Sequence, residues 1–382
     1  MPPGTPFGVY VHVPFCATRC GYCDFNTYTA TELGGGGSQA AYAGHAVAEL
    51  ALAAATLGPD RPPVSTVFLG GGTPTLLPSD DLVHVLDGVR EHLGLAPGAE
   101  VTTEANPDSV DERYLATLRE GGFTRVSFGM QSAVTSVLRV LERTHTTGRP
   151  QQAAKEAFSA GFEQVSLDLI YGTPGETDDD WWASLEAALG AGPTHVSAYA
   201  LIVEDGTRLG RQVARGLLPA PDDDVLADRY LLAEQALGGP SLPGQGWYEV
   251  SNWGEPCRHN LGYWRGGDWW GIGPGAHSHV GGVRWWNAKH PATYADRLAA
   301  GRSPGAGREL LTDEDRRVER VLLEVRLRDG LPLEVLRPAG AAAAARFVEE
   351  GLLEPAAHAA TTPTSGTEHD TRSDRRAARP RR

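Results

Sequence analysis

Short apolar stretches alternate with longer amphipathic stretches over the first half of the chain. Six stretches rich in β-branched and aromatic residues predict strands at Gly8–Phe15, Thr66–Gly71, Glu100–Ala105, Arg125–Met130, Gln164–Tyr171 and His195–Val203. Helical spacing predicts helices near residues 39–57, 79–93, 111–120, 150–160 and 178–189. Six β/α units in one run predict an α/β fold with a parallel sheet, whose chemistry lies beyond the carboxyl ends of the strands.

The pattern changes after residue 203. Pro219–Asp224 is typical of a linker, a helix is expected from about Val225 to Leu237, and Gly246–His290 is rich in aromatic residues and glycine. Residues 312–353 again have helical spacing. From Pro355 large apolar residues are almost absent, so we expect residues 356–382 to form a disordered tail. The expected domains are therefore residues 1–205, 206–305, 306–355 and the tail.

Charge and hydropathy narrow the class of protein. The formal net charge is −14, which argues against a nucleic-acid partner, because phosphate binding needs a surplus of Arg and Lys. We find no apolar run of the roughly 18 residues that would span a bilayer. The first residues lack the basic and apolar regions of a secretory signal. A cytoplasmic location is expected.

Three of the four cysteines lie within eight residues, at Cys16, Cys20 and Cys23. They follow the first predicted strand, from which a loop can present three thiolates to three irons of a cubane. The fourth iron would stay open to the amine and carboxylate of an amino acid. A structural zinc site would need a fourth Cys or His at a similar short distance, and Phe25 stands there instead.

This CxxxCxxC spacing resembles the radical S-adenosylmethionine (SAM) superfamily, and the resemblance covers about residues 8–203. It implies a partial (β/α)6 barrel that holds one [4Fe–4S] cluster on these three cysteines, together with SAM. Gly70-Gly71-Gly72-Thr73-Pro74, which alone could be a β-turn, is similar to the segment that approaches the SAM amine. The SAM contacts implied by the resemblance are Tyr10, Gly71, Gly72, Thr73, Glu104, Gln131, Arg143, Asp168 and Ala200, with the turn near His277 close to the adenine.

Seven of the nine tryptophans fall between Trp247 and Trp286, around the sequence His259-Asn260-x-x-Tyr263-Trp264. Aromatic walls suit a flat macrocycle, and His259 could supply an imidazole ligand to its iron. On the residues alone, packing of a domain interface around a hydrogen-bonded structural histidine is favoured. Cys257 is either a further thiolate ligand or a small buried apolar residue. The run Gly271–Ala276 lacks the strand, helix and acidic residue of a dinucleotide site.

Two motifs point to one branch of the superfamily. Val9–Cys16 together with Gly70–Thr75 resembles the oxygen-independent coproporphyrinogen oxidase group, and HNxxYW is similar to the haem-binding motif of the HemW-type haem chaperones within it. Phe25 stands where the oxidases carry another cysteine. Only fifteen residues precede Cys16, where the oxidases have a long extension.

This resemblance implies a haem chaperone with haem, SAM and [4Fe–4S] as cofactors, which delivers haem to an acceptor protein. The implied haem contacts are His259, Asn260, Tyr263 and Trp264. The alternative is oxygen-independent coproporphyrinogen III dehydrogenase, so enzymatic activity stays open, and no residue is assigned as catalytic. Radical modification of a peptide or nucleic acid has no supporting feature. A small winged-helix-like C-terminal domain is implied, and its completeness, dimerisation and peripheral membrane association stay open.

Overall fold

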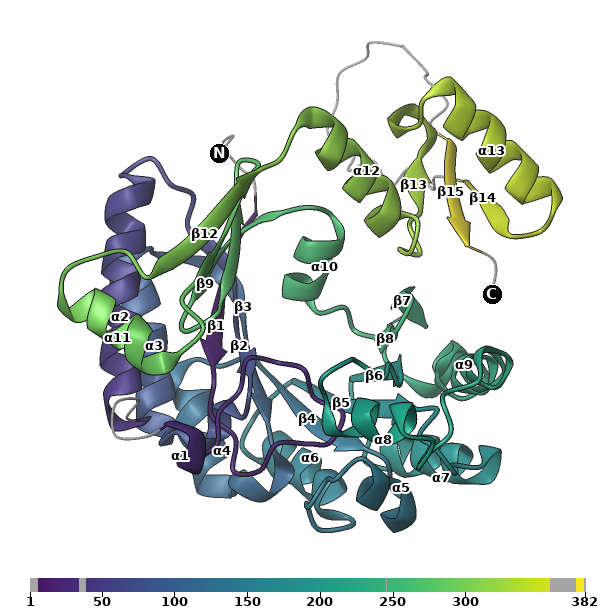
Figure 1. The fold of residues 1–382 in the computed structure, drawn as a ribbon, viewed down its shortest axis with the longest axis horizontal. Helices are drawn as coiled ribbons and strands as arrows, with labels where there is room; N and C mark the ends of the chain where they lie inside the picture. Colours follow the sequence, from purple (N-terminus) through teal and green to yellow (C-terminus); the bar gives the residue numbers. More distant parts are fainter. Residues whose placement is uncertain (1–5, 34–38, 245, 358–375, 381–382) are drawn as a thin grey trace.

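The computed structural model describes residues 6–33, 39–244, 246–357 and 376–380. Most of the described strands join one twelve-stranded sheet in the order β12-β11-β10-β9-β1-β2-β3-β4-β5-β6-β8-β7. A smaller three-stranded sheet lies near the carboxyl terminus (Figure 1). Single 3₁₀ turns occur at Pro74–Leu76, Pro107–Ser109, Gly239–Ser241 and Leu333–Val335.

Six parallel strands in sequential order form the centre of the large sheet. They are β1 (Phe7–Val13), β2 (Val64–Gly71), β3 (Leu95–Ala105), β4 (Arg125–Gln131), β5 (Gln164–Tyr171) and β6 (His195–Ala200). The connecting helices are α1 (Ala30–Leu33), α2 (Gln39–Leu57), α3 (Ser79–His92), α4 (Glu112–Gly121), α5 (Thr135–Val140), α6 (Arg149–Ser159) and α7 (Asp178–Leu189). The predicted parallel α/β core is confirmed. The sixth strand ends at Ala200, three residues before the predicted end.

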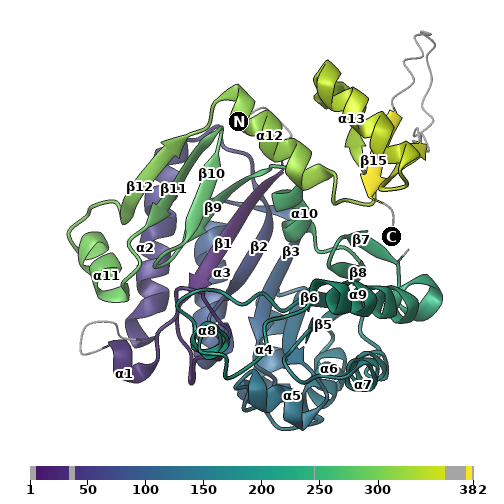
Figure 2. The ribbon, with the colours of Figure 1, turned by 45° about the vertical axis from the view of Figure 1, so that its right-hand side comes forward.

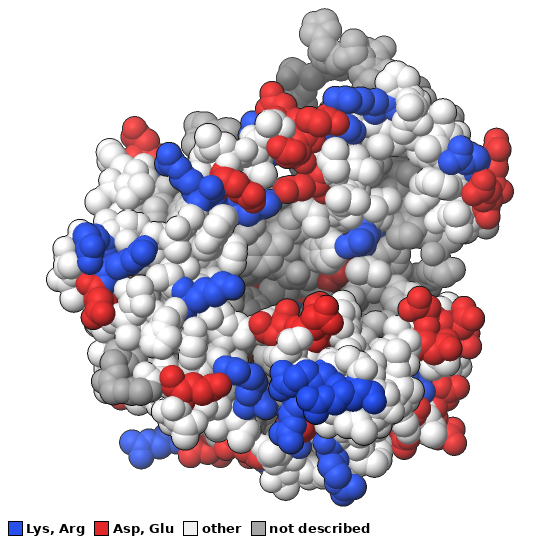
Figure 3. Space-filling model, in the orientation of Figure 1, with Lys and Arg blue, Asp and Glu red and all other residues white. Residues whose placement is uncertain are grey.

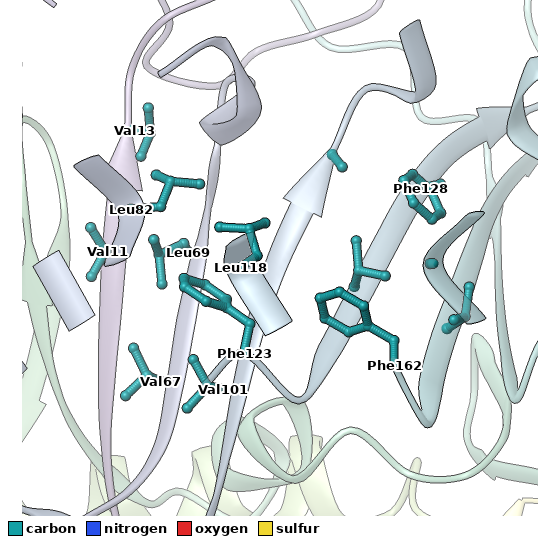
Figure 4. Packing of buried hydrophobic residues seen from close by; sticks show 14 of the residues in the cluster. Val11, Val13, Val67, Leu69, Leu82, Val101, Leu118, Phe123, Phe128 and Phe162 are labelled. Carbon is teal, nitrogen blue, oxygen red and sulfur yellow. The ribbon is translucent and has the colours of Figure 1, made fainter. Parts of the chain in front are cut away.

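The core lies between the sheet and the helices that cover its outer face. Val11, Val67 and Val101 come from three neighbouring strands and are fully or almost fully buried (Figure 4). Leu82 of α3 and Leu118 of α4 pack in the same cluster. Because burial of one such side chain contributes about 1.5–3 kcal/mol, this continuous apolar layer fixes the strand order and holds the polar ends of the strands in place.

The chain after β6 extends the sheet at both edges. β9 (Asp268–Ile272) pairs in parallel with β1, and β10 (His277–Val280), β11 (Val283–Asn287) and β12 (Gly305–Leu310) continue that edge in antiparallel fashion. At the other edge β8 (Asn252–Gly254) pairs antiparallel with β6, and β7 (Trp247–Glu249) follows. The remaining helices of this part are α8 (Arg208–Ala214), α9 (Asp223–Leu237), α10 (Arg258–Trp264) and α11 (Pro291–Ala299).

A buried carboxylate connects the extended edge to the first helix of the core. Glu49 of α2 accepts hydrogen bonds from the backbone N–H of Gly273 (2.8 Å), from Asn287 Nδ2 (2.7 Å) and from Tyr294 Oη (2.6 Å). Burial raises the pKa of Glu49 to about 7. Three segments far away in the sequence are thus fastened to one side chain of α2.

Helix α2 corrects one sequence-based expectation. We expected no segment of membrane-spanning length, but the 19 residues of α2 are long and apolar enough by length and composition. Many alanines supply this apolar character without a run of large side chains. The helix packs on the sheet, and its buried residues are Tyr42, Ala43, Ala46, Glu49, Leu50 and Ala53.

The carboxyl-terminal part contains α12 (Asp313–Glu324), α13 (Pro338–Glu349) and an antiparallel sheet in the order β13-β15-β14. Its strands are β13 (Leu331–Pro332), β14 (Leu353–Ala357) and β15 (Arg376–Pro380). Residues 376–380, which lie in the segment expected to form a disordered tail, pair with β14, whose end at Ala357 also lies in that segment. Backbone pairing can form such a ladder without large apolar side chains. Residues 358–375 and 381–382 lie outside the described residues.

Candidate functional site

The three clustered cysteines lie on a loop that leaves the carboxyl end of β1. The loop is closed at its base, because Cys16 N donates to Tyr28 O (3.0 Å) and Tyr28 N donates to Pro14 O (2.7 Å). Cys16, Cys20 and Cys23 are free thiols and half-buried. All three line a cavity of about 400 Å³, which we call the cysteine cavity.

The glycine run after β2 allows this loop to approach the sheet closely. Gly72 N donates to Val13 O (2.8 Å), and Thr73 N donates to Phe15 O (2.7 Å). A Cβ atom on Gly72 would lie 2.5 Å from the Phe15 carbonyl oxygen. Gly71 has a φ of +108°, which disfavours any other residue. The run therefore holds the cysteine loop in position and also lines the cysteine cavity.

The donor set fits an iron–sulfur cluster. Burial, followed by the neighbouring Cys20, raises the pKa of Cys16, and burial raises the pKa of Cys23 to about 11. Thiols of this kind need a metal or a cation to become thiolates. Arg143 Nη1 lies 3.5 Å from Cys20 Sγ, and the buried Nε of Arg143 has no hydrogen-bond partner.

A single metal ion is a poorer match to the loop. Among the described residues, no three His, Cys, Asp or Glu side chains come close enough to hold one ion. A cubane takes one thiolate at each of three separate irons, so it does not need the three sulfurs to converge on one point.

The residues expected to contact SAM surround two adjoining cavities at the carboxyl ends of the strands. The cysteine cavity is lined by Gly71, Gly72, Thr73, Glu104, Gln131, Arg143 and Asp168. A second cavity of about 500 Å³, which we call the aromatic cavity, is lined by Tyr10 and Ala200 and shares Glu104, Gln131 and Asp168 with the first. His277 lies on β10 and is not among the residues that line either cavity, and its expected place near the SAM adenine stays a prediction.

Two half-buried carboxylates line both cavities and form the wall between them. Glu104 Oε2 accepts a hydrogen bond from Gly71 N (3.0 Å), and Asp168 accepts from the Ser127 hydroxyl at 2.8 and 2.9 Å. Burial, with the Asp168 charge second, raises the pKa of Glu104 to about 8. Burial also raises the pKa of Asp168. These groups are suited to accept hydrogen bonds from ligand hydroxyls or to face a ligand cation.

The raised pKa of Glu104 gives a pH prediction for the ligand-free protein. The folded state binds this proton more tightly than the unfolded chain, whose Glu titrates near 4.5. The stabilisation is complete below about pH 4.5 and is lost as the pH rises through 8. Glu104→Gln mimics the protonated form and cannot lose this proton. Between pH 5 and pH 8 the Tm of the wild type should therefore fall by several degrees more than the Tm of Glu104→Gln. The exposed Glu120→Gln is the control, and parallel Tm curves for wild type and Glu104→Gln would contradict the assignment.

The backbone is strained where β4 enters the site. Gln131 has a φ of +62°, and the pairing of β4 with β5 shifts register between Gly129 and Gln131. A non-glycine residue in this region costs on the order of 1 kcal/mol. The strain turns Gln131 toward both cavities, and the carbonyl of Gly129 accepts a hydrogen bond from Arg143 Nη2 (2.8 Å).

The HNxxYW motif forms helix α10 at the opposite end of the parallel core. Figure 2 shows α10 beside the amino ends of β1–β3, and the cysteine loop and α8 near the carboxyl ends. His259 is only 3% exposed, its Nδ1 lies 2.8 Å from Thr66 Oγ1 and its Nε2 lies 2.9 Å from Tyr263 Oη. Burial lowers the pKa of His259 to about 3, so the imidazole is neutral. Both ring nitrogens are engaged, so iron ligation by His259 would require the loss of a hydrogen bond.

The other motif residues also bond within the protein. Asn260 Nδ2 donates to Glu249 Oε1 (3.1 Å), and Trp264 donates to the same carboxylate. Glu100 accepts from the backbone N–H groups of Arg258 (3.1 Å) and His259 (3.0 Å) at the start of α10. His259, Asn260 and Tyr263 line the inner end of the aromatic cavity. The motif thus docks α10 as the floor of this cavity, and its role in haem binding stays a prediction.

Comparison with known proteins agrees with this geometry. The Radical SAM superfamily model matches residues 10–188. "Heme chaperone HemW" of Mycobacterium tuberculosis is 57% identical over 355 residues, which cover 92% of this chain and 90% of that protein. The chain belongs to the HemW family of the radical SAM superfamily. "Heme chaperone HemW" of Escherichia coli is 37% identical over 72% of this chain and 70% of its own length.

A solved structure has the same fold as this chain. Coproporphyrinogen III oxidase (HemN) from Escherichia coli superposes with a TM-score of 0.76 and covers 92% of this chain and 85% of that chain. Its sequence identity is 22%, so this likeness concerns the fold and not the activity.

The motifs that identify the HemW family did not reveal every residue of the site. Ser127, Ser166 and Ser197, which hydrogen-bond Asp168, were missed. Their signal was present in the sequence, since each is a polar residue inside an otherwise apolar strand. Arg125 was also missed. Its buried guanidinium lines the aromatic cavity and donates to Gln164 Oε1 (3.3 Å) and Glu255 O (3.2 Å).

Proposed function

We propose that this protein is a haem chaperone. It binds haem together with one [4Fe–4S] cluster on Cys16, Cys20 and Cys23 and SAM, and it passes the haem to an acceptor protein. The observation that carries the proposal is the 57% identity to a protein named heme chaperone HemW over 90% of that protein's length. A cytoplasmic location is part of the proposal, because thiolate clusters persist in a reducing compartment.

The geometry supports the proposal through the joined cavities. The aromatic cavity has walls of Tyr10, Tyr22, Phe68, Tyr248 and Tyr263, and flat apolar ligands favour such walls. Its volume of about 500 Å³ lies in the usual range for ligand sites. It shares Cys23, Glu104 and Asp168 with the cysteine cavity, so a ligand there would lie beside the cluster loop.

Each part of the site has a chemical task in this proposal. A bound cluster would supply one-electron chemistry, and its open iron would accept the amine and carboxylate of SAM. Arg143 is placed to stabilise the Cys20 thiolate, and Gln131 and Asp168 face the space beside it. Glu104 offers a carboxyl group next to the glycine run. The buried side chains around them exclude water from the shared wall.

Separate assays of haem binding and porphyrinogen oxidation test the proposed function. The anaerobically reconstituted protein should take up haem with a shifted Soret band and leave coproporphyrinogen III unconverted under reducing conditions with SAM. Phe25 supports this expectation, because it stands where the oxidases carry another cysteine. Multiple turnovers of coproporphyrinogen III would instead identify a dehydrogenase, and absence of haem uptake would contradict the chaperone assignment.

A further inference from the structure

Three large apolar side chains are exposed at the mouth of the aromatic cavity. Phe25 follows the cysteines and is 60% exposed, and Tyr199 and Ile202 at the end of β6 are 45% and 68% exposed. All three line the cavity, and we call them the apolar rim. Contact of these large apolar side chains with water is unfavourable, and a bound ligand would remove it. Their grouping at the mouth of one cavity therefore indicates a binding surface.

A group of cations lies on the other side of Phe25. Arg19, Arg208, Arg211 and Lys289 line an outer cavity of about 650 Å³ together with Phe25, Cys20 and Cys23. We call these four residues the basic cluster. Figure 3 shows basic side chains gathered over α8, in a chain whose net charge is −14. Asp24, Glu142 and Asp205 line the same cavity, so the cluster exceeds its carboxylates by one charge.

Two of these cations have no carboxylate partner among the described residues, although Arg211 Nη1 also donates a hydrogen bond to Gly206 O (2.6 Å). Arg208 pairs with Glu142 (3.0 Å), and Arg19 pairs with Glu32 (3.1 Å). Arg211 and Lys289 have no carboxylate within 4.0 Å among the residues that the structure describes, and both are exposed. Phe25 and Cys23 line all three cavities, so the apolar rim and the basic cluster meet at Phe25.

We propose that haem binds at this mouth, with its macrocycle against the apolar rim and its carboxylates at Arg211 and Lys289. This inference rests on the proposed haem chaperone function and names its site. Haem is flat and apolar, and its two carboxylates leave the ring along one edge. The surface around Phe25 has a matching arrangement, because the apolar rim lies on one side of Phe25 and the basic cluster lies on the other. Charge-assisted hydrogen bonds would hold the carboxylates.

The interior of the aromatic cavity fits the carboxylate edge less well. Glu104 and Asp168 lie in its wall, where the pKa of each is already raised, so a haem carboxylate placed beside them would also be disfavoured in its charged form. At the inner end, the polar groups of the HNxxYW motif already bond to Thr66 and Glu249. Binding at the mouth keeps the haem carboxylates outside and leaves one face of the macrocycle accessible to an acceptor.

Three variants test the site by Soret titration of the reconstituted full-length chain. Ile202→Asp and Phe25→Ser should each raise the Kd for haem about tenfold or more, because they remove apolar contact. The Arg211→Gln/Lys289→Gln variant should raise the Kd for haem about tenfold and leave the Kd for haem dimethyl ester unchanged. Iron and sulfide analysis should show full cluster content, and if Phe25→Ser loses cluster, Ile202→Asp carries the test.

Matched controls are Leu217→Ser, an equally exposed apolar residue outside the rim, and Lys155→Gln/Arg113→Gln, two exposed cations elsewhere. Unchanged haem affinity in both Ile202→Asp and Arg211→Gln/Lys289→Gln would overturn this site while the wild type still binds haem. If the wild-type protein does not bind haem, the proposed haem chaperone function itself is contradicted. If the charge variant binds haem normally but its cluster is reduced more slowly by an acidic electron-donor protein, the basic cluster docks that protein and the inference is wrong.

Discussion

Cys20→Ala is expected to abolish stable [4Fe–4S] binding, and Cys16→Ala and Cys23→Ala should do the same. Each substitution removes one of three protein ligands from a cluster that has no fourth thiolate in the loop. Cys20 has the further contact with Arg143, which would be left beside an apolar methyl group. Iron and sulfide analysis together with EPR spectroscopy of the anaerobically reconstituted variants measures the loss.

Cys257→Ala is the matched control, because this thiol is buried at the start of α10. Its Sγ lies 3.4 Å from Glu100 Oε1, and burial raises its pKa to about 12. A thiol held protonated in this way is a poor metal ligand. Cys257→Ala should therefore retain full cluster content. Full cluster content in Cys20→Ala would overturn the assignment of the cluster to the loop.

Glu49→Ala is expected to lower stability by about 3 kcal/mol or more. The substitution leaves the buried donors of Gly273 and Tyr294 without an acceptor, and Asn287 Nδ2 keeps only its bond to Gly273 O (3.0 Å); each unsatisfied donor costs about 1–3 kcal/mol. Part of this cost is offset because the wild-type carboxyl is itself buried, as its raised pKa shows. The Tm in a thermal melt should fall by about 5 °C or more.

Two further variants make the Glu49 test specific. Tyr294→Phe removes one of the three donors, so its effect should be smaller than that of Glu49→Ala. Glu91→Ala, at an exposed position near the end of α3, should leave the Tm within about 1 °C of the wild type. A wild-type Tm for Glu49→Ala would show that the edge strands do not depend on this anchor.

The parallel core was predictable from the sequence because its signals are local. Apolar runs such as that of β5 (Gln164–Tyr171) are buried on both faces and are bounded by turn residues, so their positions and order follow from pattern alone. The ends of strands were less certain. The side chain of Ile202 is apolar and β-branched, and it favoured a longer sixth strand, but the chain leaves the sheet after Ala200.

The edges of the sheet were not predictable, because they depend on pairs far apart in the sequence. Phe7 pairs with Asp268, and His195 pairs with Gly254. The spacing of tryptophans in this region indicates burial but does not say which strand each segment joins. The strand Arg376–Pro380 had no apolar signal at all.

The grouping of the cysteine loop and the strand-end residues around two cavities was predictable because their spacing and positions matched known motifs, and their contacts with a cluster and SAM stay predictions. The position of the HNxxYW motif in the fold could not be predicted from the sequence. Periodicity cannot show that His259 and Tyr263 bond to each other, that Asn260 and Trp264 share Glu249, or that α10 lies at the amino ends of the strands. The position of α10 depends on a contact between residues far apart in the sequence, the hydrogen bond between His259 and Thr66.

The pairing of β1 with β9 has a consequence for biosynthesis. One edge of β1 is complete only after about 260 further residues have left the ribosome. At about 5–20 residues per second this takes roughly 13–50 s. During that interval β1 presents unpaired N–H and C=O groups next to the loop that carries Cys16, Cys20 and Cys23. The nascent chain therefore needs protection at this edge, and the cluster loop reaches its final support only when nearly three quarters of the protein has been made.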